Sequence, residues 1–203
     1  MHTSGRNPVT RIAEGSLRGD RDVRCGVGGG DQVRGYANPS KIDLGSDVTL
    51  QKARTWDEGV ETNFSTSSMA DIFAGKKVVI FGLPGAFTGV CTRSHVPSFA
   101  SNAEHFRSKG VDSIICVSLN DPYVMKGWGT SLGCSDKIAF YGDFNGAFTA
   151  MMGLDCDLSG ALMGPRCQRW SALVENGEIK SLNVEETPAQ FVVSSGDYLL
   201  KKM

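Results

Sequence analysis

The stretch that decides the fold is residues 77–92, which read KVVIFGLPGAFTGVCT. It opens with a β-branched and aromatic run, Lys77–Phe81, which is typical of a buried strand. After a loop that contains glycine and proline, apolar residues recur at three- and four-residue steps over Val96–Phe106, as on one face of a helix. This order predicts a strand that passes through a tight loop into a helix. We expect that helix to bend at Pro97 and to end at Lys109-Gly110.

Strand and helix patterns alternate through the rest of the chain and end in a hairpin. Asn176-Gly177 carries the strongest short hairpin signal. Three strands that alternate with two helices, followed by a hairpin and a closing helix, favour a thioredoxin-like α/β fold, with a central mixed sheet flanked by helices. The expected elements are strands over Val111–Leu119 and Ile138–Tyr141, a helix from Asn120-Asp121-Pro122 to Gly133, hairpin strands over Trp170–Val174 and Ile179–Val184, and a last helix carrying Tyr198, Leu199 and Leu200.

Composition excludes several classes of protein. The chain has 203 residues, 40% of them hydrophobic, which suits one globular domain with a tail. A formal net charge of −1 gives no basic surface for nucleic acid. Apolar runs stay far below the ~18 residues of a membrane span, so we expect no membrane partner. The 6 cysteines are too sparse for a disulfide scaffold, and no C-x-x-C pair is present.

Residues 1–36 differ from the remainder of the chain. They carry arginines and no lysine, are rich in glycine and have few large apolar residues, so we expect a disordered leader. An Arg-rich leader without an apolar stretch resembles a mitochondrial transit peptide, and Arg34-Gly35-Tyr36-Ala37 resembles a processing site. Its acidic residues leave two alternatives open, a vector-derived segment or a plain tail. The expected domain is residues 37–203, in the mitochondrial matrix, with the cytoplasm or a plastid as alternatives.

Cys91 is the candidate nucleophile. It falls at the start of the predicted helix, where unpaired N–H groups and the helix dipole favour a thiolate. Thr88 lies three residues earlier, a spacing that brings its hydroxyl toward the sulfur. Pro84 fixes the loop and is expected to shield the sulfur from water. The alternative for Cys91 is a small buried hydrophobic residue, but its polar, glycine-containing neighbours favour chemistry.

These residues carry a family resemblance. Pro84-x-x-x-Thr88-x-x-Cys91 resembles the active-site signature of the peroxiredoxins, and the form Pro-Gly-Ala-Phe-Thr-x-x-Cys is typical of their type II, or peroxiredoxin-5, subfamily. Residues 50–59 further resemble the plant mitochondrial type II branch. Similar stretches occur at His95–Pro97, Val117–Asp121, Tyr141–Asp143, Gly164–Arg166 and Asn183–Glu186, so that the resemblance covers residues 48–203.

The resemblance implies a thiol peroxidase that reduces hydrogen peroxide and alkyl hydroperoxides without a cofactor. Cys91 would be the peroxidatic cysteine and become a sulfenic acid, Thr88 would orient the peroxide, and Pro84 would form the pocket wall. The family's arginine would be Arg169, with Arg166 as the competing candidate. A guanidinium keeps its charge and can stabilise the thiolate and polarise the leaving oxygen.

A second thiol is needed to resolve the sulfenic acid. Cys116 lies 25 residues after Cys91, the spacing of the resolving cysteine in plant type II peroxiredoxins. It fits an ordinary core-strand cysteine equally well, and both interpretations stay open. The resemblance implies glutaredoxin, glutathione or thioredoxin as the reductant. Cys25, Cys134, Cys156 and Cys167 have no motif around them and are expected to be incidental thiols, with Cys167 as a candidate secondary oxidation site.

Two other classes of protein are alternatives to a peroxidase: a redox switch and a cysteine hydrolase. The same oxidation could serve a peroxide-sensing switch without efficient turnover. His95 lies one turn after Cys91 and raises the question of a Cys–His hydrolase, but a base on the same helix points alongside the sulfur, so we interpret His95 as a pocket-edge or packing residue. Relatives of type II imply a homodimer, to which Phe87 and Trp128 could contribute.

Overall fold

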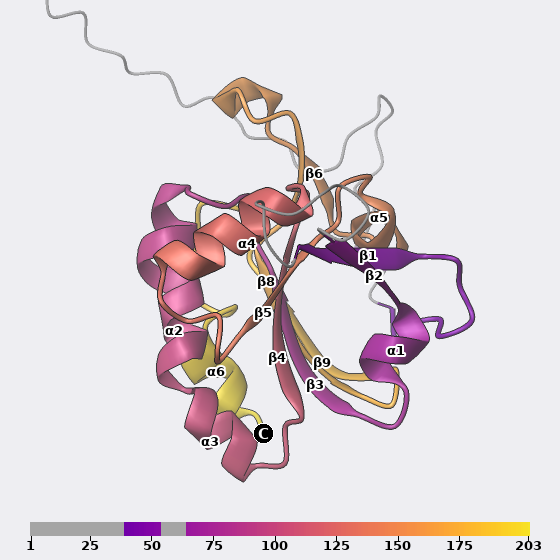
Figure 1. Cartoon of the computed structure of the whole chain (residues 1–203). Coiled ribbons are helices and arrows are strands. Elements are labelled where there is room, and N and C mark those ends of the chain that lie inside the picture. Colours follow the sequence, from indigo (N-terminus) through magenta and orange to yellow (C-terminus); the bar gives the residue numbers. More distant parts are fainter. Residues whose placement is uncertain (1–38, 54–63) are drawn as a thin grey trace, which may run out of the picture.

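The protein is built around one mixed sheet of seven strands (Figure 1). The structure, a computed structural model, describes residues 39–53 and 64–203; the predicted leader and the domain boundary at residue 37 lie outside them. The strand order is β2-β1-β5-β4-β3-β8-β9, with β3, β4 and β5 parallel and the other neighbours antiparallel. The strands are β1 (Thr49–Ala53), β2 (Phe64–Ser68), β3 (Lys77–Gly82), β4 (Ser113–Ser118), β5 (Ala139–Gly142), β8 (Trp170–Glu175) and β9 (Glu178–Val184).

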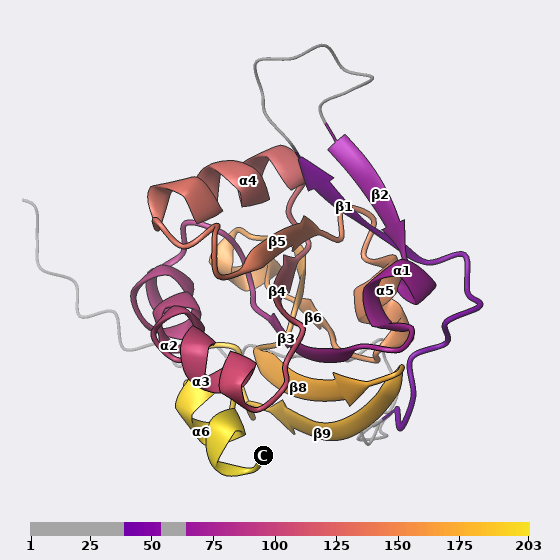
Figure 2. The same ribbon diagram turned by 60° about the horizontal axis from the view of Figure 1, so that its bottom comes forward.

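Helices cover both faces of the sheet (Figures 1 and 2). One face carries α2 (Val96–Ser101), α3 (Ala103–Ser108), α4 (Pro122–Ser131) and α6 (Gly196–Lys201), and the other carries α1 (Met69–Phe73) and α5 (Ala147–Met151). Val79 and Phe81 belong to the first core, while Val78 and Ile80 belong to the second. Because β3 is buried on both faces, its sequence is a continuous apolar run rather than an alternating one. No helix of the described residues is long and apolar enough to cross a membrane.

The predicted thioredoxin-like fold and most predicted elements are confirmed. Helix α4 begins as expected, because the Asp121 side chain accepts hydrogen bonds from the amides of Tyr123 and Val124, both at 2.9 Å, with Pro122 in the first turn. The β8–β9 hairpin turns at Asn176 and Gly177, whose φ angles are 49° and 80°. Two successive positive φ angles are what a tight hairpin turn requires, and Asn-Gly supplies them at low cost.

The helix after β3 is more broken than predicted. It contains a π-helical turn, η1 (Cys91–His95), in which the amide of Val96 donates to the carbonyl of Cys91. Pro97, which has no amide hydrogen, follows this turn directly. The helix breaks again at Asn102, whose side-chain amide donates to the carbonyl of Ser98 at 2.9 Å and so competes with the backbone. The predicted single helix is therefore three segments, which end, as expected, just before Lys109-Gly110.

Several elements were not predicted from the sequence. Strands β1 and β2 are short and largely polar, since β2 reads FSTSS at the sheet edge. Helix α1 carries a readable signal, because Ser68 and Asp71 form a capping box. A second sheet has two strands, β6 (Asp155–Asp157) and β7 (Pro165–Cys167), which are connected through the 3-10 turn η2 (Ser159–Ala161). This sheet projects from the body of the protein in Figure 1.

Candidate active site

Cys91 lies where the loop after β3 becomes a helix. Helical conformation begins at Gly89, and the amide of Thr92 donates to the carbonyl of Thr88 at 3.0 Å. Cys91 is therefore in the first helical turn, as predicted, and its side chain is fully buried. The first turn of a helix has backbone amides without a partner inside the helix, and Cys91 lies at this end of the helix.

Arg169, and not Arg166, reaches Cys91. Strand β8 pairs with β3 so that Trp170 lies opposite Gly82, which places Arg169 beside the start of the Cys91 loop. Its Nη1 donates to the sulfur of Cys91 at 3.4 Å, and the residue is only 2% exposed. The Nε of Arg166 donates instead to the carbonyl of Met163 at 2.9 Å. Of the two candidate arginines, Arg169 is the one whose guanidinium contacts Cys91.

The guanidinium of Arg169 is held from three directions. Its Nε and Nη2 donate to the carbonyl oxygen of Pro188 at 3.1 Å and 2.9 Å. Its Nη1 also donates to Nδ1 of His95 at 3.1 Å, so that the other ring nitrogen, Nε2, is left to donate to the carbonyl of Ser194 at 3.1 Å. Burial, and then the charge of Arg169, lower the pKa of His95 well below its ordinary value, which keeps the ring neutral.

His95 is a buried residue whose ring contacts Arg169. Both ring nitrogens are engaged, one by Arg169 and the other by Ser194, so neither is left to take a proton from Cys91. This arrangement argues against a Cys–His hydrolase. Of the two interpretations, the packing residue is confirmed, because His95 is fully buried and its ring packs against Phe81, Phe99 and Phe191. Its contact with Nη1 also holds Arg169 in place.

Glu185 is a further residue that sequence reasoning did not single out. One of its carboxylate oxygens accepts from the amides of Val192, Val193 and Ser194 at 2.7, 2.9 and 2.8 Å, and from the hydroxyl of Ser194 at 2.7 Å. These bonds fix the segment that presents the carbonyls of Pro188 and Ser194 to Arg169 and His95. The available signal was the family-like stretch Asn183–Glu186.

The loop between β3 and Cys91 is fixed from β4. The amide of Ala86 donates to Oδ1 of Asn120 at 2.9 Å, and the hydroxyl of Ser118 donates to the same oxygen at 2.9 Å. Pro84 is buried within this loop. The hydroxyl of Thr88 donates to the carbonyl of Gly85 at 2.8 Å, and its orientation toward a peroxide stays a prediction, as does the wall role of Pro84.

Two more free thiols lie near Cys91. Cys116 is fully buried in β4 between Phe81 of β3 and Phe140 of β5. Burial, followed by the negative charge of Cys91, raises the pKa of the Cys116 thiol well above its ordinary value. The sulfur of Cys167 donates to the carbonyl of Leu83 at 3.0 Å, and burial followed by the charge of Cys91 also raises its pKa.

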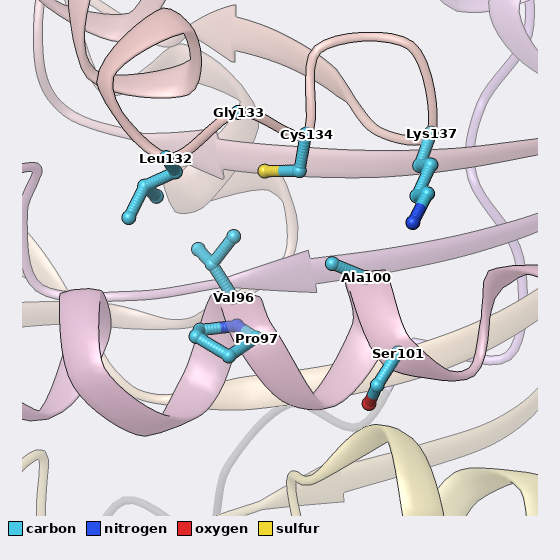
Figure 3. Close-up of a pocket in the computed structure, with 8 residues that line it drawn as sticks. All are labelled: Val96, Pro97, Ala100, Ser101, Leu132, Gly133, Cys134 and Lys137. Carbon is cyan, nitrogen blue, oxygen red and sulfur yellow. The ribbon is translucent and has the colours of Figure 1, made fainter.

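A fourth free thiol, Cys134, belongs to the same core cluster as Cys91 and Cys116. Figure 3 shows its sulfur facing Val96 and Ala100 across a pocket between α2 and the residues after α4. Burial raises its pKa. The free cysteines of the described residues are Cys91, Cys116, Cys134 and Cys167; Cys156 is not among them, so the expectation of an incidental thiol does not hold there, and Cys25 lies outside the described range. Within that range, no His, Cys, Asp or Glu cluster could hold a metal ion.

The two aromatic residues expected at a dimer surface differ in exposure. Phe87 is 63% exposed on the Cys91 loop and has a φ of 60°. Trp128 is fully buried, and its Nε1 donates to the hydroxyl of Thr92 at 3.2 Å. The expectation that Trp128 contributes to a surface is therefore wrong, because the ring is buried against the helix that carries Cys91.

Comparison with known proteins agrees with this geometry. Residues 46–200 match the model of the Redoxin family. The chain is 54% identical over 178 residues to Peroxiredoxin-2F, mitochondrial, of Arabidopsis thaliana, which covers 84% of this chain and 87% of the relative. It is 57% identical over 156 residues to Peroxiredoxin-2F, mitochondrial, of Oryza sativa subsp. japonica, with coverage of 77% and 79%. The structure of reduced Prx3 from Vibrio vulnificus in complex with H2O2 is similar with a TM-score of 0.71, 35% identity and coverage of 81% and 98%.

The fold and the buried cysteine–arginine pair thus define a redoxin, a protein that does thiol chemistry on a thioredoxin-like fold. More narrowly, the chain belongs to the type II peroxiredoxins. It is a thiol peroxidase, an enzyme that reduces peroxides. The predicted family, fold class and activity are confirmed.

Proposed function

We propose that Cys91 is the peroxidatic cysteine and that Arg169 activates it. The observation that carries this assignment is the contact of 3.4 Å between Nη1 of Arg169 and the sulfur of Cys91, made inside the protein where a fixed positive charge acts strongly. The thiolate attacks one oxygen of the peroxide, the O–O bond breaks, and the second oxygen leaves with a proton as water or an alcohol. Cys91 is oxidised to a sulfenic acid.

Thr88 and Pro84 complete the peroxide site in this proposal. Since the hydroxyl hydrogen of Thr88 is used on the carbonyl of Gly85, its oxygen is left to accept a hydrogen bond. A peroxide O–H can donate to that oxygen while Arg169 donates to the other end of the molecule. Pro84, buried in the same loop, forms the apolar wall that keeps bulk water from the sulfur.

Cys116 resolves the sulfenic acid in this proposal, and glutaredoxin, glutathione or thioredoxin returns the enzyme to its reduced form. A disulfide requires Cα atoms within about 7 Å, whereas Cys91 starts a helix and Cys116 lies mid-strand. The first turns of the Cys91 helix must therefore open before the bond can form. Amide hydrogen exchange should be faster over η1 in the oxidised protein than in the reduced protein, and equal rates would contradict this step.

Substitution of the thiols tests the assignment directly. Cys91→Ser should abolish peroxide reduction, because a hydroxyl does not supply the nucleophile. Cys134→Ser is the matched control, since it removes a buried thiol from the same core and should retain the activity. Full peroxidase activity in Cys91→Ser would refute the proposal.

We also propose a homodimer that forms beside the active site. Phe87 and Phe144 are 63% and 62% exposed, and they follow the carboxyl ends of the parallel strands β3 and β5. Two exposed phenylalanines after the carboxyl ends of parallel strands of the same sheet suit an apolar contact with a second copy of the chain. Light scattering should find a dimer that Phe87→Ser shifts toward monomer, while Phe64→Ser on the edge strand β2 leaves it intact.

For location, we propose that residues 1–36 direct residues 37–203 to the mitochondrial matrix. The Arg-rich composition and the mitochondrial names of the two Peroxiredoxin-2F relatives support this. Incubation of the full chain with isolated mitochondria should yield a protected product whose new N-terminus lies near Tyr36-Ala37. A chain that stays outside, or that is imported equally well without residues 1–36, would contradict the proposal.

A further inference from the structure

Cys167 is a buried thiol in direct contact with the loop that carries Cys91. It ends β7, is 1% exposed, and its sulfur donates to the carbonyl of Leu83, the first residue after β3, at 3.0 Å. Two residues later Arg169 donates to the sulfur of Cys91. Burial, and then the negative charge of Cys91, raise the pKa of the Cys167 thiol.

The backbone of Cys167 is also freer to move than that of Cys116. Cys116 is paired with Phe81 on one side and with Phe140 on the other, in the middle of the main sheet. Cys167 belongs to the two-stranded sheet, where its strand partner is Asp155. A segment with strand pairing on one side opens at a lower free energy than a central strand.

We propose that Cys167 is a second resolving thiol, which competes with Cys116 for the sulfenic acid on Cys91. This inference rests on the proposed role of Cys91. The sulfur of Cys167 attacks the sulfur of Cys91, the S–O bond breaks, and the hydroxide that leaves takes up the proton given by Cys167, so that one disulfide and one water form. A thiol reductant, glutathione or a protein dithiol, then supplies the two electrons that return both cysteines to thiols.

Oxidation of Cys91 itself prepares Cys167 for this step. While Cys91 is a thiolate, its charge opposes ionisation of Cys167. A sulfenic acid carries no such charge, and the guanidinium of Arg169, which favours the Cys167 thiolate, stays in place. The attacking thiol thus becomes easier to ionise only after its target has formed.

Peptide mapping of the full chain tests the proposal. Tryptic cleavage after lysine and arginine gives residues 78–93, 110–126 and 167–169, each with one cysteine: Cys91, Cys116 and Cys167. After one equivalent of hydrogen peroxide and alkylation of the free thiols, non-reducing mass spectrometry should find 78–93 linked to 167–169 as well as to 110–126. A digest in which 78–93 is linked to 110–126 alone would overturn the proposal.

Serine variants separate the two resolving thiols. Cys116→Ser should still form the link between 78–93 and 167–169, with loss of dimedone capture at Cys91. The double variant Cys116→Ser with Cys167→Ser should recover that capture, whereas Cys116→Ser with Cys134→Ser, the matched control, should not. Serine keeps a donor for the carbonyl of Leu83, which protects the fold.

The outcomes distinguish the inference from the assignment on which it rests. If Cys116→Ser alone accumulates dimedone-labelled Cys91 and no linked peptide, Cys167 does not resolve, although Cys91 remains the peroxidatic residue. If peroxide leaves Cys91 as an unmodified thiol in every variant, the assignment of Cys91 fails first. A link from 78–93 to 167–169 without any link to 110–126 would confirm Cys167 as a resolving thiol and would exclude Cys116 from that role.

Discussion

Replacement of Arg169 by lysine keeps the positive charge but changes its shape. The guanidinium uses three nitrogens: Nη1 contacts Cys91 and His95 at 3.4 and 3.1 Å, while Nε and Nη2 contact Pro188 at 3.1 and 2.9 Å. A lysine places one nitrogen at the end of a flexible chain. It cannot lie against the sulfur and also donate two hydrogen bonds to the carbonyl oxygen of Pro188.

The expected loss follows from the contact with Cys91. Removal of one preorganised donor from a water-excluded site costs about 10²–10³ in rate, or about 2.7–4 kcal/mol. We therefore expect Arg169→Lys to lower kcat/KM for hydrogen peroxide by about that factor, because a single ammonium group cannot hold the Pro188 carbonyl and contact the sulfur at the same time. Arg166→Lys, in which the changed side chain contacts Met163 rather than Cys91, should stay within about threefold.

The measurement is the rate of oxidation of Cys91 in a single turnover, which is monitored by intrinsic tryptophan fluorescence and by dimedone labelling of quenched samples. The Nε1 of Trp128 donates to the hydroxyl of Thr92, next to Cys91, so this indole lies close to the reaction. Circular dichroism must first show that each variant is folded. Near-normal oxidation in Arg169→Lys, together with a large loss in Arg166→Lys, would refute the assignment of the arginine.

Three further predictions concern the support of the site. Glu185→Gln should destabilise the protein by about 2–4 kcal/mol in urea unfolding, since four hydrogen bonds to one oxygen lose their charge assistance, whereas the exposed neighbour variant Glu186→Gln should stay within about 0.5 kcal/mol. The neutral buried ring of His95 binds a proton in the unfolded chain at about pH 6.5 and resists one in the folded state, so stability should fall as pH drops below about 6.5, by up to ~1.4 kcal/mol per pH unit. His95→Gln should flatten that slope, and urea midpoints at about pH 7.5 and about pH 5.5 would show whether it does. Gly129→Ala would place a methyl group 2.6 Å from Cδ2 of Phe140 and should lower stability by about 1–3 kcal/mol, and an unchanged unfolding midpoint would show that α4 can shift away from β5.

The predictable part of the structure is the part that local sequence determines. The β3 run, the Asp121 cap of α4 and the Asn176-Gly177 turn each specify their element through a few adjacent residues, and all three appear as predicted. Strands β1 and β2 escaped prediction because their polar sequences form strands only through pairing with one another and, for β1, with β5. Tertiary context decides such segments.

The candidate site also has a part that local sequence predicts and a part that it does not. Cys91 and Thr88 share one loop and could be found from their spacing, but the contacts of Arg169 with His95 and Pro188 join residues 74 and 19 positions apart. Nothing in local periodicity reports such a contact. The hydrogen bonds that one oxygen of Glu185 accepts from Val192–Ser194 could not be predicted from local sequence either, although Asn183–Glu186 was recognised as a stretch similar to the family.

The buried pair of Arg169 and His95 also explains how the charge beside Cys91 can be constant. Two cations in one buried pocket would repel each other and would both lack water, so one of the two groups must stay neutral. Arginine cannot give up its proton in this range of pH, and the pKa of His95 is accordingly the one that falls. His95 then accepts from Arg169 as a neutral ring instead of competing with it. The positive charge of Arg169 therefore lies next to the sulfur of Cys91 without a second cation beside it in the same pocket.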